Sequence, residues 1–131
     1  MPQFKIIPSR EKILARIPNY AVDLEPIKKP VTVTCNGTVI AESDEALMIR
    51  ETKHEDVVYL PRSAMKPEYF TPTDHSTYCP FKGNANYWRL DLDGVTEDNI
   101  VWSYEKPYEE VAPLKDYISF YPDRTEITVT A

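Results

Sequence analysis

The sequence predicts one mainly β (all-β) domain, in which short antiparallel strands are joined by stiff loops with one or two short helical turns. Its 131 residues are enough to bury a single hydrophobic core but not two. Twelve prolines accompany three glycines, and proline both ends helices and is excluded from central strands. The third observation is Asn36-Gly37, which lies between two runs rich in β-branched residues. This pair predicts a type I′ hairpin, because both turn residues need positive φ.

Residues 1–30 are expected to form a proline-rich arm packed on a domain of residues 31–131. The arm carries proline at positions 2, 8, 18, 26 and 30. These leave room for little more than one helical turn, near residues 10–17, because proline interrupts a helix when it lies in the interior.

The hairpin over residues 31–41 is followed by two more predicted strands and a loop. Side chains alternate in character over residues 47–51, as they do in a strand. Residues 56–60 predict another strand, which the proline at position 61 stops. Residues 61–80 contain four prolines and little periodicity, so we expect an ordered loop with a turn of helix near residues 63–66.

The second half of the chain predicts hairpins. Residues 86–92 alternate as in a strand, Asp93-Gly94 supplies a turn, and residues 99–104 return antiparallel. A helical turn is expected over residues 109–115. Residues 117–121 and 125–130 are expected to form a closing hairpin around a turn at residues 122–124.

Charge and composition exclude several classes of partner. A net charge of −6 argues against nucleic acid, which is bound by clustered lysine and arginine. No apolar run approaches the roughly 20 residues of a membrane span, and the N-terminus lacks a secretory signal. Two cysteines are too few for a disulfide framework. We therefore expect a cytoplasmic protein without nucleic-acid or membrane partners; the oligomeric state does not follow from the sequence.

The segment over residues 74–88 concentrates the side chains that carry chemistry. It contains His75, Cys79 and Lys82 among several aromatic residues, with a proline and a glycine to shape the chain. The whole chain has two histidines and two cysteines, and one of each lies four residues apart here. We expect a functional site to be built from this segment.

The same segment resembles a known family, the domain of unknown function four hundred and twenty-seven, which also carries a nucleotidyltransferase-like label. The most specific match is the string Cys-Pro-Phe-Lys-Gly at residues 79–83. Other matching pieces lie at residues 36–43, 51, 58–62, 77–88, 102–107 and 118–122. The resemblance covers roughly residues 20–130 in the right order. It implies a β-tent fold, in which two antiparallel sheets meet at an angle.

Many relatives in that fold hold zinc with two Cys-x-x-Cys knuckles, and this chain has no such knuckle. A zinc site built from His75 and Cys79 would also need Cys35 and His54, and Cys35 lies beside a hairpin turn. We therefore expect no metal and no other cofactor. The family's label would require carboxylates that bind metal, and Asp91-Leu92-Asp93 has a suitable spacing. No Gly-Ser pair precedes it, and Asp93-Gly94 is a better turn.

Our leading hypothesis is a pocket that binds a small anionic or zwitterionic molecule. Aromatic side chains come from several strands, and alternation sends neighbours such as Tyr87 and Trp88 to opposite faces. One subset is then free to line a concave surface, with fixed charges beside it. The expected ligand-binding residues are Glu51, Tyr59, Arg62, Lys82, Tyr87 and Trp102. In this hypothesis Lys82 and Arg62 supply charge, and Glu51 orients Arg62 or accepts a proton from the ligand.

Two other classes of function stay open. In a thiol-dependent enzyme, Cys79 would be the nucleophile or redox thiol, His75 the base and Lys82 an electrostatic stabiliser. The plainer interpretation is that Cys79 packs as a small apolar side chain. The third class is a protein-interaction module that uses exposed aromatic side chains, for which the sequence offers no discriminating motif.

Overall fold

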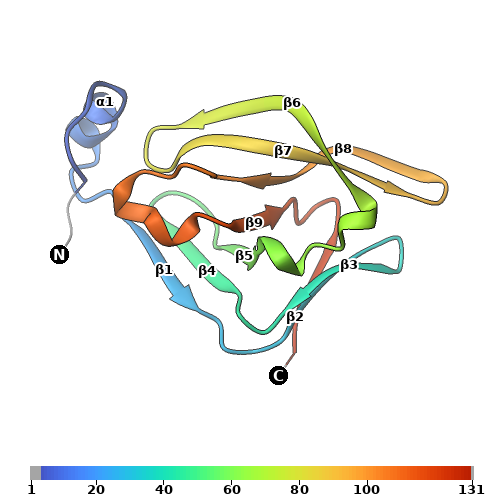
Figure 1. Cartoon of the computed structure of the whole chain (residues 1–131). Coiled ribbons are helices and arrows are strands. Elements are labelled where there is room, and N and C mark those ends of the chain that lie inside the picture. Colours follow the sequence, from blue (N-terminus) through green and yellow to red (C-terminus); the bar gives the residue numbers. More distant parts are fainter. Residues whose placement is uncertain (1–3, 131) are drawn as a thin grey trace.

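A computed structural model of the chain describes residues 4–130 and shows a mainly β protein with two antiparallel sheets. Figure 1 shows the long ribbon of strands β6, β7 and β8 on one side and the β2–β3 hairpin on the other, with β9 between them. The predicted fold class is therefore confirmed. In the described residues, no helix has the length and apolar character that a membrane span requires.

The larger sheet has seven strands in the order β1-β4-β5-β9-β8-β7-β6. Their bounds are Val22–Pro26 (β1), Leu47–Glu51 (β4), Val57–Pro61 (β5), Phe70–Cys79 (β6), Gly83–Leu92 (β7), Val95–Ser103 (β8) and Tyr117–Phe120 (β9). The smaller sheet has the order β10-β2-β3, with bounds Glu126–Val129, Val31–Cys35 and Thr38–Ser43. The turn between β2 and β3 has φ of 50° at Asn36 and 80° at Gly37, which confirms the predicted hairpin.

The segment expected to be an arm contains both a helix and a strand. Helix α1, Pro8–Arg16, is nine residues long, about two and a half turns rather than one. Pro8 begins it, because the first helical position needs no amide hydrogen. Strand β1 pairs with β4 and forms one edge of the seven-stranded sheet. The structure therefore places α1 outside the sheets and β1 within them.

The prediction of a loop over residues 61–80 is wrong for the second half of that range. Two single turns of 3-10 helix, η1 (Arg62–Ala64) and η2 (Pro67–Tyr69), are followed by the ten-residue strand β6. The turn predicted near residues 63–66 corresponds to η1. Pro72 is tolerated in β6 because this is an edge strand, and its pairing with β7 is interrupted between Pro72 and Ser76.

The predicted closing hairpin is also wrong. β9 pairs with β5 and β8 in the larger sheet, whereas β10 pairs with β2 in the smaller one. The chain crosses between the sheets at Arg124, whose guanidinium donates to Glu97 at 2.8 Å and to the carbonyl of Asp98 at 2.9 Å. These bonds fix the crossing, and local pattern gave no sign of them. The helical turn predicted near residue 109 is present as η3, Glu109–Leu114.

The strand register divides the larger sheet into two apolar faces. Leu60, Ile118, Phe120, Val101 and Trp88 face the smaller sheet and form the main core with it. The opposite face carries the row Tyr59, Ser119, Trp102 and Tyr87, which are successive cross-strand partners on β5, β9, β8 and β7. The predicted separation of Tyr87 from Trp88 is confirmed, and it leaves one aromatic face for a site.

Among the described glycines, Gly83, which ends the turn between β6 and β7, has the least space for a side chain. Gly83 has φ of 114°, and a Cβ there would lie 3.1 Å from the carbonyl oxygen of Lys106. Gly94 also has positive φ, 78°, but a Cβ there would meet nothing within 4 Å.

We therefore predict that Gly83→Ala lowers the free energy of unfolding by about 2–3 kcal/mol, because backbone strain and a close contact add together. Gly94→Ala is the matched control and should cost about 1 kcal/mol, since it carries the strain alone. Urea denaturation of both variants measures the difference. Equal losses would show that the close approach at Gly83 contributes nothing.

Candidate functional site

A cavity of about 420 Å³ opens on the aromatic face of the larger sheet. Strands β4, β5, β7 and β8 and the turn between β6 and β7 supply most of its walls. Five of the predicted ligand residues line it, namely Glu51, Tyr59, Lys82, Tyr87 and Trp102. Cys79 lines it as well. The structure thus brings together residues that the sequence singled out from four separate segments.

The turn after β6 places two of these residues in the cavity. Cys79 and Gly83 are paired across the hairpin, and the amide of Lys82 donates to the carbonyl of Cys79 at 3.3 Å. Between them, Phe81 is fully buried and stacks on Tyr20 with ring centroids 4.1 Å apart. The turn is held from outside by the amide of Tyr108, which donates to the carbonyl of Lys82 at 3.1 Å. Phe81 fixes the turn by packing on Phe4 and Tyr20, and it lines the cavity together with Cys79 and Lys82.

A buried ion pair forms part of the cavity wall. The Nζ of Lys82 donates to Oε1 of Glu51, and the hydroxyl of Tyr20 donates to Oε2 of the same carboxylate. The side chains of Lys82 and Glu51 are 10% and 9% exposed. Nε2 of His54 lies 3.7 Å from Oε2 of Glu51, at the exposed rim. Charges this deeply buried are stable only when paired and hydrogen-bonded, so each partner requires the other.

Aromatic rings form the opposite wall. Nε1 of Trp102 donates to the hydroxyl of Tyr59 at 3.0 Å, with the two rings nearly perpendicular. Ser119 lies between these residues in the register, and its small side chain turns away to donate to the carbonyl of Val58 at 2.8 Å. The gap over Ser119 lets the two large side chains meet. The ring of Tyr121 packs on Trp102 with centroids 4.7 Å apart.

Two further tyrosines differ in how their hydroxyls are satisfied. The hydroxyl of Tyr87 hydrogen-bonds to Oγ1 of Thr77 at 2.9 Å. Tyr104 is 7% exposed and lines the cavity, and its ring lies 5.9 Å from the Nζ of Lys82. Within the described residues, no group hydrogen-bonds to the Tyr104 hydroxyl.

Burial raises the pKa of four phenols in the cavity wall. Desolvation raises the pKa of Tyr59 and Tyr104 well above the ordinary value, and it does the same for Tyr20, where Glu51 adds to the effect. Desolvation also raises the pKa of Tyr121 to about 12. These hydroxyls stay protonated at neutral pH and act as hydrogen-bond donors as well as acceptors.

The structure places Arg62 outside the cavity. Its guanidinium lies 4.9 Å from the centroid of the Trp88 ring and pairs with Glu105 at 2.9 Å. Trp88 is on the core face of β7, opposite to Tyr87, so Arg62 is on the wrong side of the sheet to meet Lys82. Glu51 therefore pairs with Lys82 rather than with Arg62.

His75 also lies outside the cavity lining. It is exposed on β6 and packs edge-on against the ring of Tyr87, with centroids 4.6 Å apart. The histidine that lines the cavity is His54. In the part of the chain that the structure describes, no histidine hydrogen-bonds to the Cys79 thiol.

Carboxylates outside the cavity do not gather into a metal site. Among residues 4–130, no group of three or more His, Cys, Asp or Glu side chains is placed to hold a metal ion. Asp91 has a spacing from Asp93 that would suit the metal-binding carboxylates of a nucleotidyltransferase. Its carboxylate instead accepts hydrogen bonds from Arg89 at 3.0 Å and from Thr96 at 3.1 Å.

Tyr20, Tyr104 and Tyr121 are among the cavity residues that were not predicted as ligand residues. Tyr104 and Tyr121 end two of the predicted strands, residues 99–104 and 117–121. Alternation alone does not tell which aromatic side chains share a face when the register between strands is unknown. Tyr20 lies in the segment expected to be an arm. Nothing in its local sequence indicates that its hydroxyl meets Glu51, 31 residues further along the chain.

Residues 23–131 match the family described as Domain of unknown function (DUF427), and the chain belongs to that family. No functionally curated protein matches the chain. The matched region contains all the predicted ligand residues, whereas two residues that line the cavity, Ile13 and Tyr20, precede it.

The buried pair generates a direct prediction about stability. Lys82→Met leaves the Glu51 carboxylate buried without its cation, so the free energy of unfolding should fall by about 3–5 kcal/mol. The double variant Glu51→Gln with Lys82→Met removes both charges and keeps their volume. It should recover most of that loss, because breaking one side of a buried pair costs more than neutralising both.

Urea unfolding of the native chain and the two variants measures these differences. A matched exposed pair, Arg62 with Glu105, should show a loss of about 1 kcal/mol or less in Arg62→Met, because both side chains are 44% exposed. If Lys82→Met lowers the free energy of unfolding no more than Arg62→Met does, then Glu51 and Lys82 do not depend on each other as a buried ion pair.

Proposed function

We propose that the protein binds a small zwitterionic molecule in the aromatic cavity. The observation that carries this proposal is the buried pair of Glu51 and Lys82 in the cavity wall. The sequence left anionic and zwitterionic ligands open. The pairing of Lys82 and the position of Arg62 outside the cavity favour the zwitterion, because neither cation is left unopposed beside the ligand.

The pair offers a ligand both signs of charge at one place. A ligand carboxylate approaches Lys82 while its ammonium group approaches Glu51, so each protein charge keeps an opposite charge beside it throughout. A purely anionic ligand would instead meet the carboxylate of Glu51, and a purely cationic one the ammonium of Lys82. Like charges in a desolvated site are costly, so the zwitterion is the form that fits.

The rest of the cavity suits an apolar, flat body attached to that charged group. Tyr59, Tyr87, Trp102 and Tyr121 present ring faces and edges, which bind apolar and aromatic groups. The Tyr104 hydroxyl supplies one further hydrogen bond. A cavity of about 420 Å³ lies within the range of small-molecule sites, roughly 300–1,000 Å³.

We also place this function in the cytoplasm. Both cysteines are free thiols, Cys35 buried and Cys79 at the cavity. Free thiols persist in a reducing compartment. A thiol-dependent reaction at Cys79 remains an alternative prediction, and it needs a base other than His75.

The test is a thermal-shift comparison of three compounds that share a phenyl ring. Phenylalanine is the zwitterion, phenethylamine the cation and 3-phenylpropionate the anion. We predict that the zwitterion raises the Tm by more than either of the others. A ligand that binds the folded state alone stabilises it by about 2.7 kcal/mol when its concentration is about 100-fold above the Kd.

Two variants identify the site of that effect. The double variant Glu51→Gln with Lys82→Met should abolish the advantage of the zwitterion, while Arg62→Ala, outside the cavity, should leave it unchanged. If all three compounds shift the Tm equally, or if the double variant retains the preference, then the charged pair does not select the ligand.

A further inference from the structure

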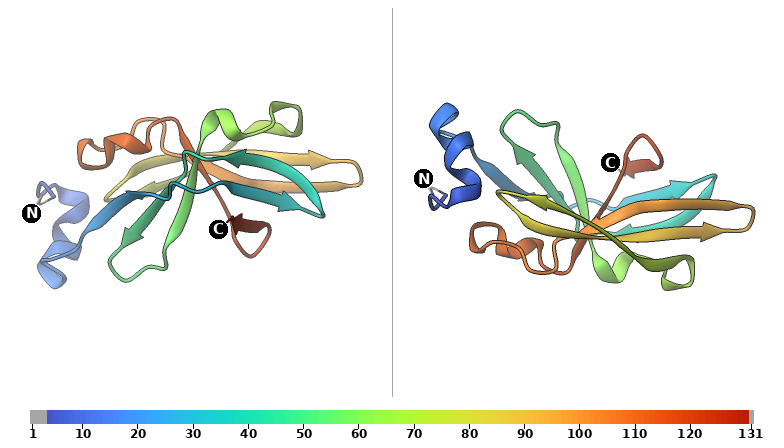
Figure 2. Two further views of the ribbon diagram at one scale, coloured as in Figure 1. Left: turned by 90° about the horizontal axis from the view of Figure 1, so that it is seen from below. Right: turned by 90° about the horizontal axis from the view of Figure 1, so that it is seen from above.

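The segment of residues 4–20 lies across the end of the molecule and precedes the matched family region. Figures 1 and 2 show its helix α1 outside the sheets, beside the turn between β6 and β7. Residues 11–19 have exposed or half-buried side chains throughout. None of these side chains hydrogen-bonds to the remainder of residues 4–130.

Two residues fasten this segment, one on each side of the exposed stretch. Tyr20 is 8% exposed, stacks on Phe81 and donates its hydroxyl to Glu51. Arg10 is 1% exposed, although it lies near the start of a surface helix. Ile13 lies between these two points and lines the cavity, as does Tyr20 itself. The segment is therefore one wall of the ligand site.

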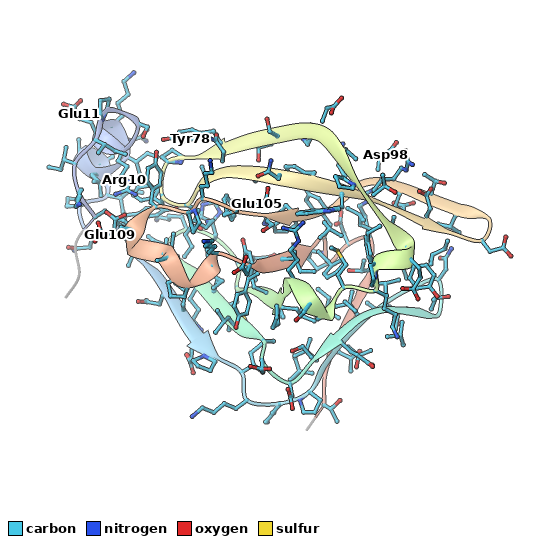
Figure 3. All side chains as sticks on the ribbon, in the orientation of Figure 1. Arg10, Glu11, Tyr78, Asp98, Glu105 and Glu109 are labelled. Carbon is cyan, nitrogen blue, oxygen red and sulfur yellow. The ribbon has the colours of Figure 1, made fainter. Side chains whose placement is uncertain are left out.

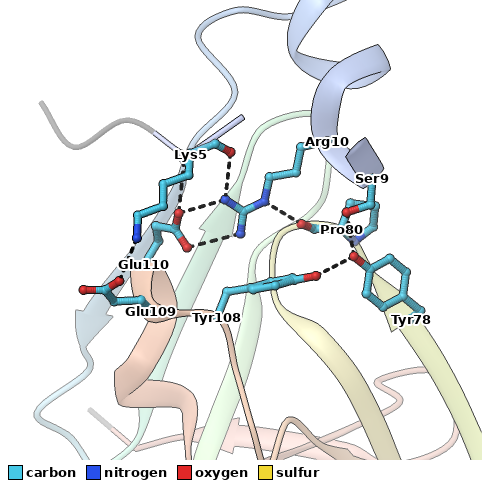
Figure 4. Close-up of polar contacts among 8 residues, drawn as sticks. All are labelled: Lys5, Ser9, Arg10, Tyr78, Pro80, Tyr108, Glu109 and Glu110. Atoms are coloured by element: carbon cyan, nitrogen blue, oxygen red, sulfur yellow. Dashed lines mark hydrogen bonds and ion pairs between the residues drawn. The ribbon is translucent and has the colours of Figure 1, made fainter. Parts of the chain in front are cut away.

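Arg10 joins three separate parts of the chain (Figure 4). Its Nε donates to the carbonyl of Pro80 at 2.7 Å, in the turn that carries Cys79 and Lys82. Its two terminal nitrogens donate to the two carboxylate oxygens of Glu110 at 2.8 and 3.2 Å. One of them also donates to the carbonyl of Lys5 at 3.2 Å. Bidentate, charge-assisted bonds of this kind are among the strongest polar contacts in proteins.

Aromatic rings enclose the same guanidinium. The Cζ of Arg10 lies 4.9 Å from the centroid of Phe4, 5.5 Å from that of Phe81 and 4.6 Å from that of Tyr108. The hydrogen bond from Arg10 lowers the pKa of Glu110 to about 2, so this carboxylate stays charged at neutral pH. A buried arginine with so many partners holds its helix firmly at one point.

The other polar contacts of the segment are weaker. Lys5 pairs with Glu109 at 3.1 Å, with side chains 73% and 81% exposed, and such pairs contribute little. Ser9 and Tyr108 each hydrogen-bond to the hydroxyl of Tyr78, which is 49% exposed. Figure 3 shows Arg10, Glu109 and Tyr78 together at this end of the molecule, with Asp98 at the far end. Arg10 is therefore the main fastening on this side.

We propose that residues 4–20 form a strap that closes one wall of the ligand cavity, with Arg10 as its releasable catch and Ile13 as the residue that limits the size of the ligand. The strap opens by local release of residues 5–19 while the sheets stay folded. No side chain of residues 11–19 is hydrogen-bonded to the body, so loss of the Arg10 contacts is the main polar cost of opening. The packing of Phe4 on Phe81 and the half-buried side chains of Ile13, Leu14 and Ile17 add an apolar cost. The role in ligand binding rests on the function proposed above, but the strap itself is tested without any ligand.

The experiment uses the thiol of Cys79 as a probe of access to the cavity. Iodoacetamide labels the folded protein, and peptide mass mapping reports the rate separately at Cys79 and at Cys35, which is buried in the core between the sheets. In Arg10→Met we expect the Cys79 rate to rise by about tenfold, because charge-assisted contacts that hold the closed form are lost. The rate at Cys35 should not change.

Lys5→Met is the matched control, since Lys5 belongs to the same segment and pairs with the neighbouring glutamate. Iodoacetamide should label Cys79 in Lys5→Met at the same rate as in the native protein. Ile13→Trp fills the space under the strap, so it should slow labelling of Cys79 by a bulky maleimide more than labelling by iodoacetamide.

If Arg10→Met accelerates the labelling of both Cys79 and Cys35, the variant is globally unstable. The labelling rates in Glu110→Gln then test the strap instead. Glu110→Gln weakens the catch from the body side and leaves α1 intact. An unchanged Cys79 rate in the folded Arg10→Met or Glu110→Gln protein would overturn the strap, and it would do so without bearing on whether the cavity binds a zwitterion.

Discussion

The ion pair between Glu51 and Lys82 is the interaction on which the rest of the site depends. Glu51 ends β4, near one edge of the larger sheet, and Lys82 lies in the turn between β6 and β7, at the other edge. Neither charge is stable at this depth alone. Their pairing therefore joins the two edges of the sheet across the aromatic face, and it fixes the turn that also places Cys79. Tyr20 adds a third segment to the same carboxylate.

The aromatic cavity follows from how the sheet distributes large and small side chains. The main core lies between the two sheets and uses one face of β5, β7, β8 and β9. On the other face, Ser119 leaves a gap in the row of aromatics, and Tyr59 and Trp102 meet over it. The 3-10 helix η3 of the matched family region packs Val111 and Leu114 into the same apolar cluster as Tyr59 and Tyr87, and neither residue lines the cavity. The wall is completed by α1 and Tyr20, which come from the preceding segment, so the site is shared between the family domain and the residues before it.

The sequence predicted what depends on local pattern. The Asn36-Gly37 turn and the strands that contain Glu51 and Tyr59 are confirmed, since each is encoded within a few residues. Errors arose where distant partners decide. Pro72 is tolerated in β6 because β6 is an edge strand, which the local sequence does not reveal. Strand β10 pairs with β2 rather than with β9, its expected hairpin partner. Arg62 was expected beside Lys82, but the strand register puts it on the other side of the sheet. Arg10 gave no signal, because its partners at positions 5, 80 and 110 are assembled by the fold alone.

The proposed binding of a zwitterion against the charged pair on the aromatic face has one direct test. The two tryptophans report on opposite faces of the sheet, Trp102 in the cavity and Trp88 in the core between the sheets. Their indole N–H resonances in a ¹H–¹⁵N spectrum should respond differently when phenylalanine is titrated into the protein. We predict that the Trp102 signal moves in a saturable way while the Trp88 signal stays in place. Saturable binding that moves Trp88 or neither indole would contradict it.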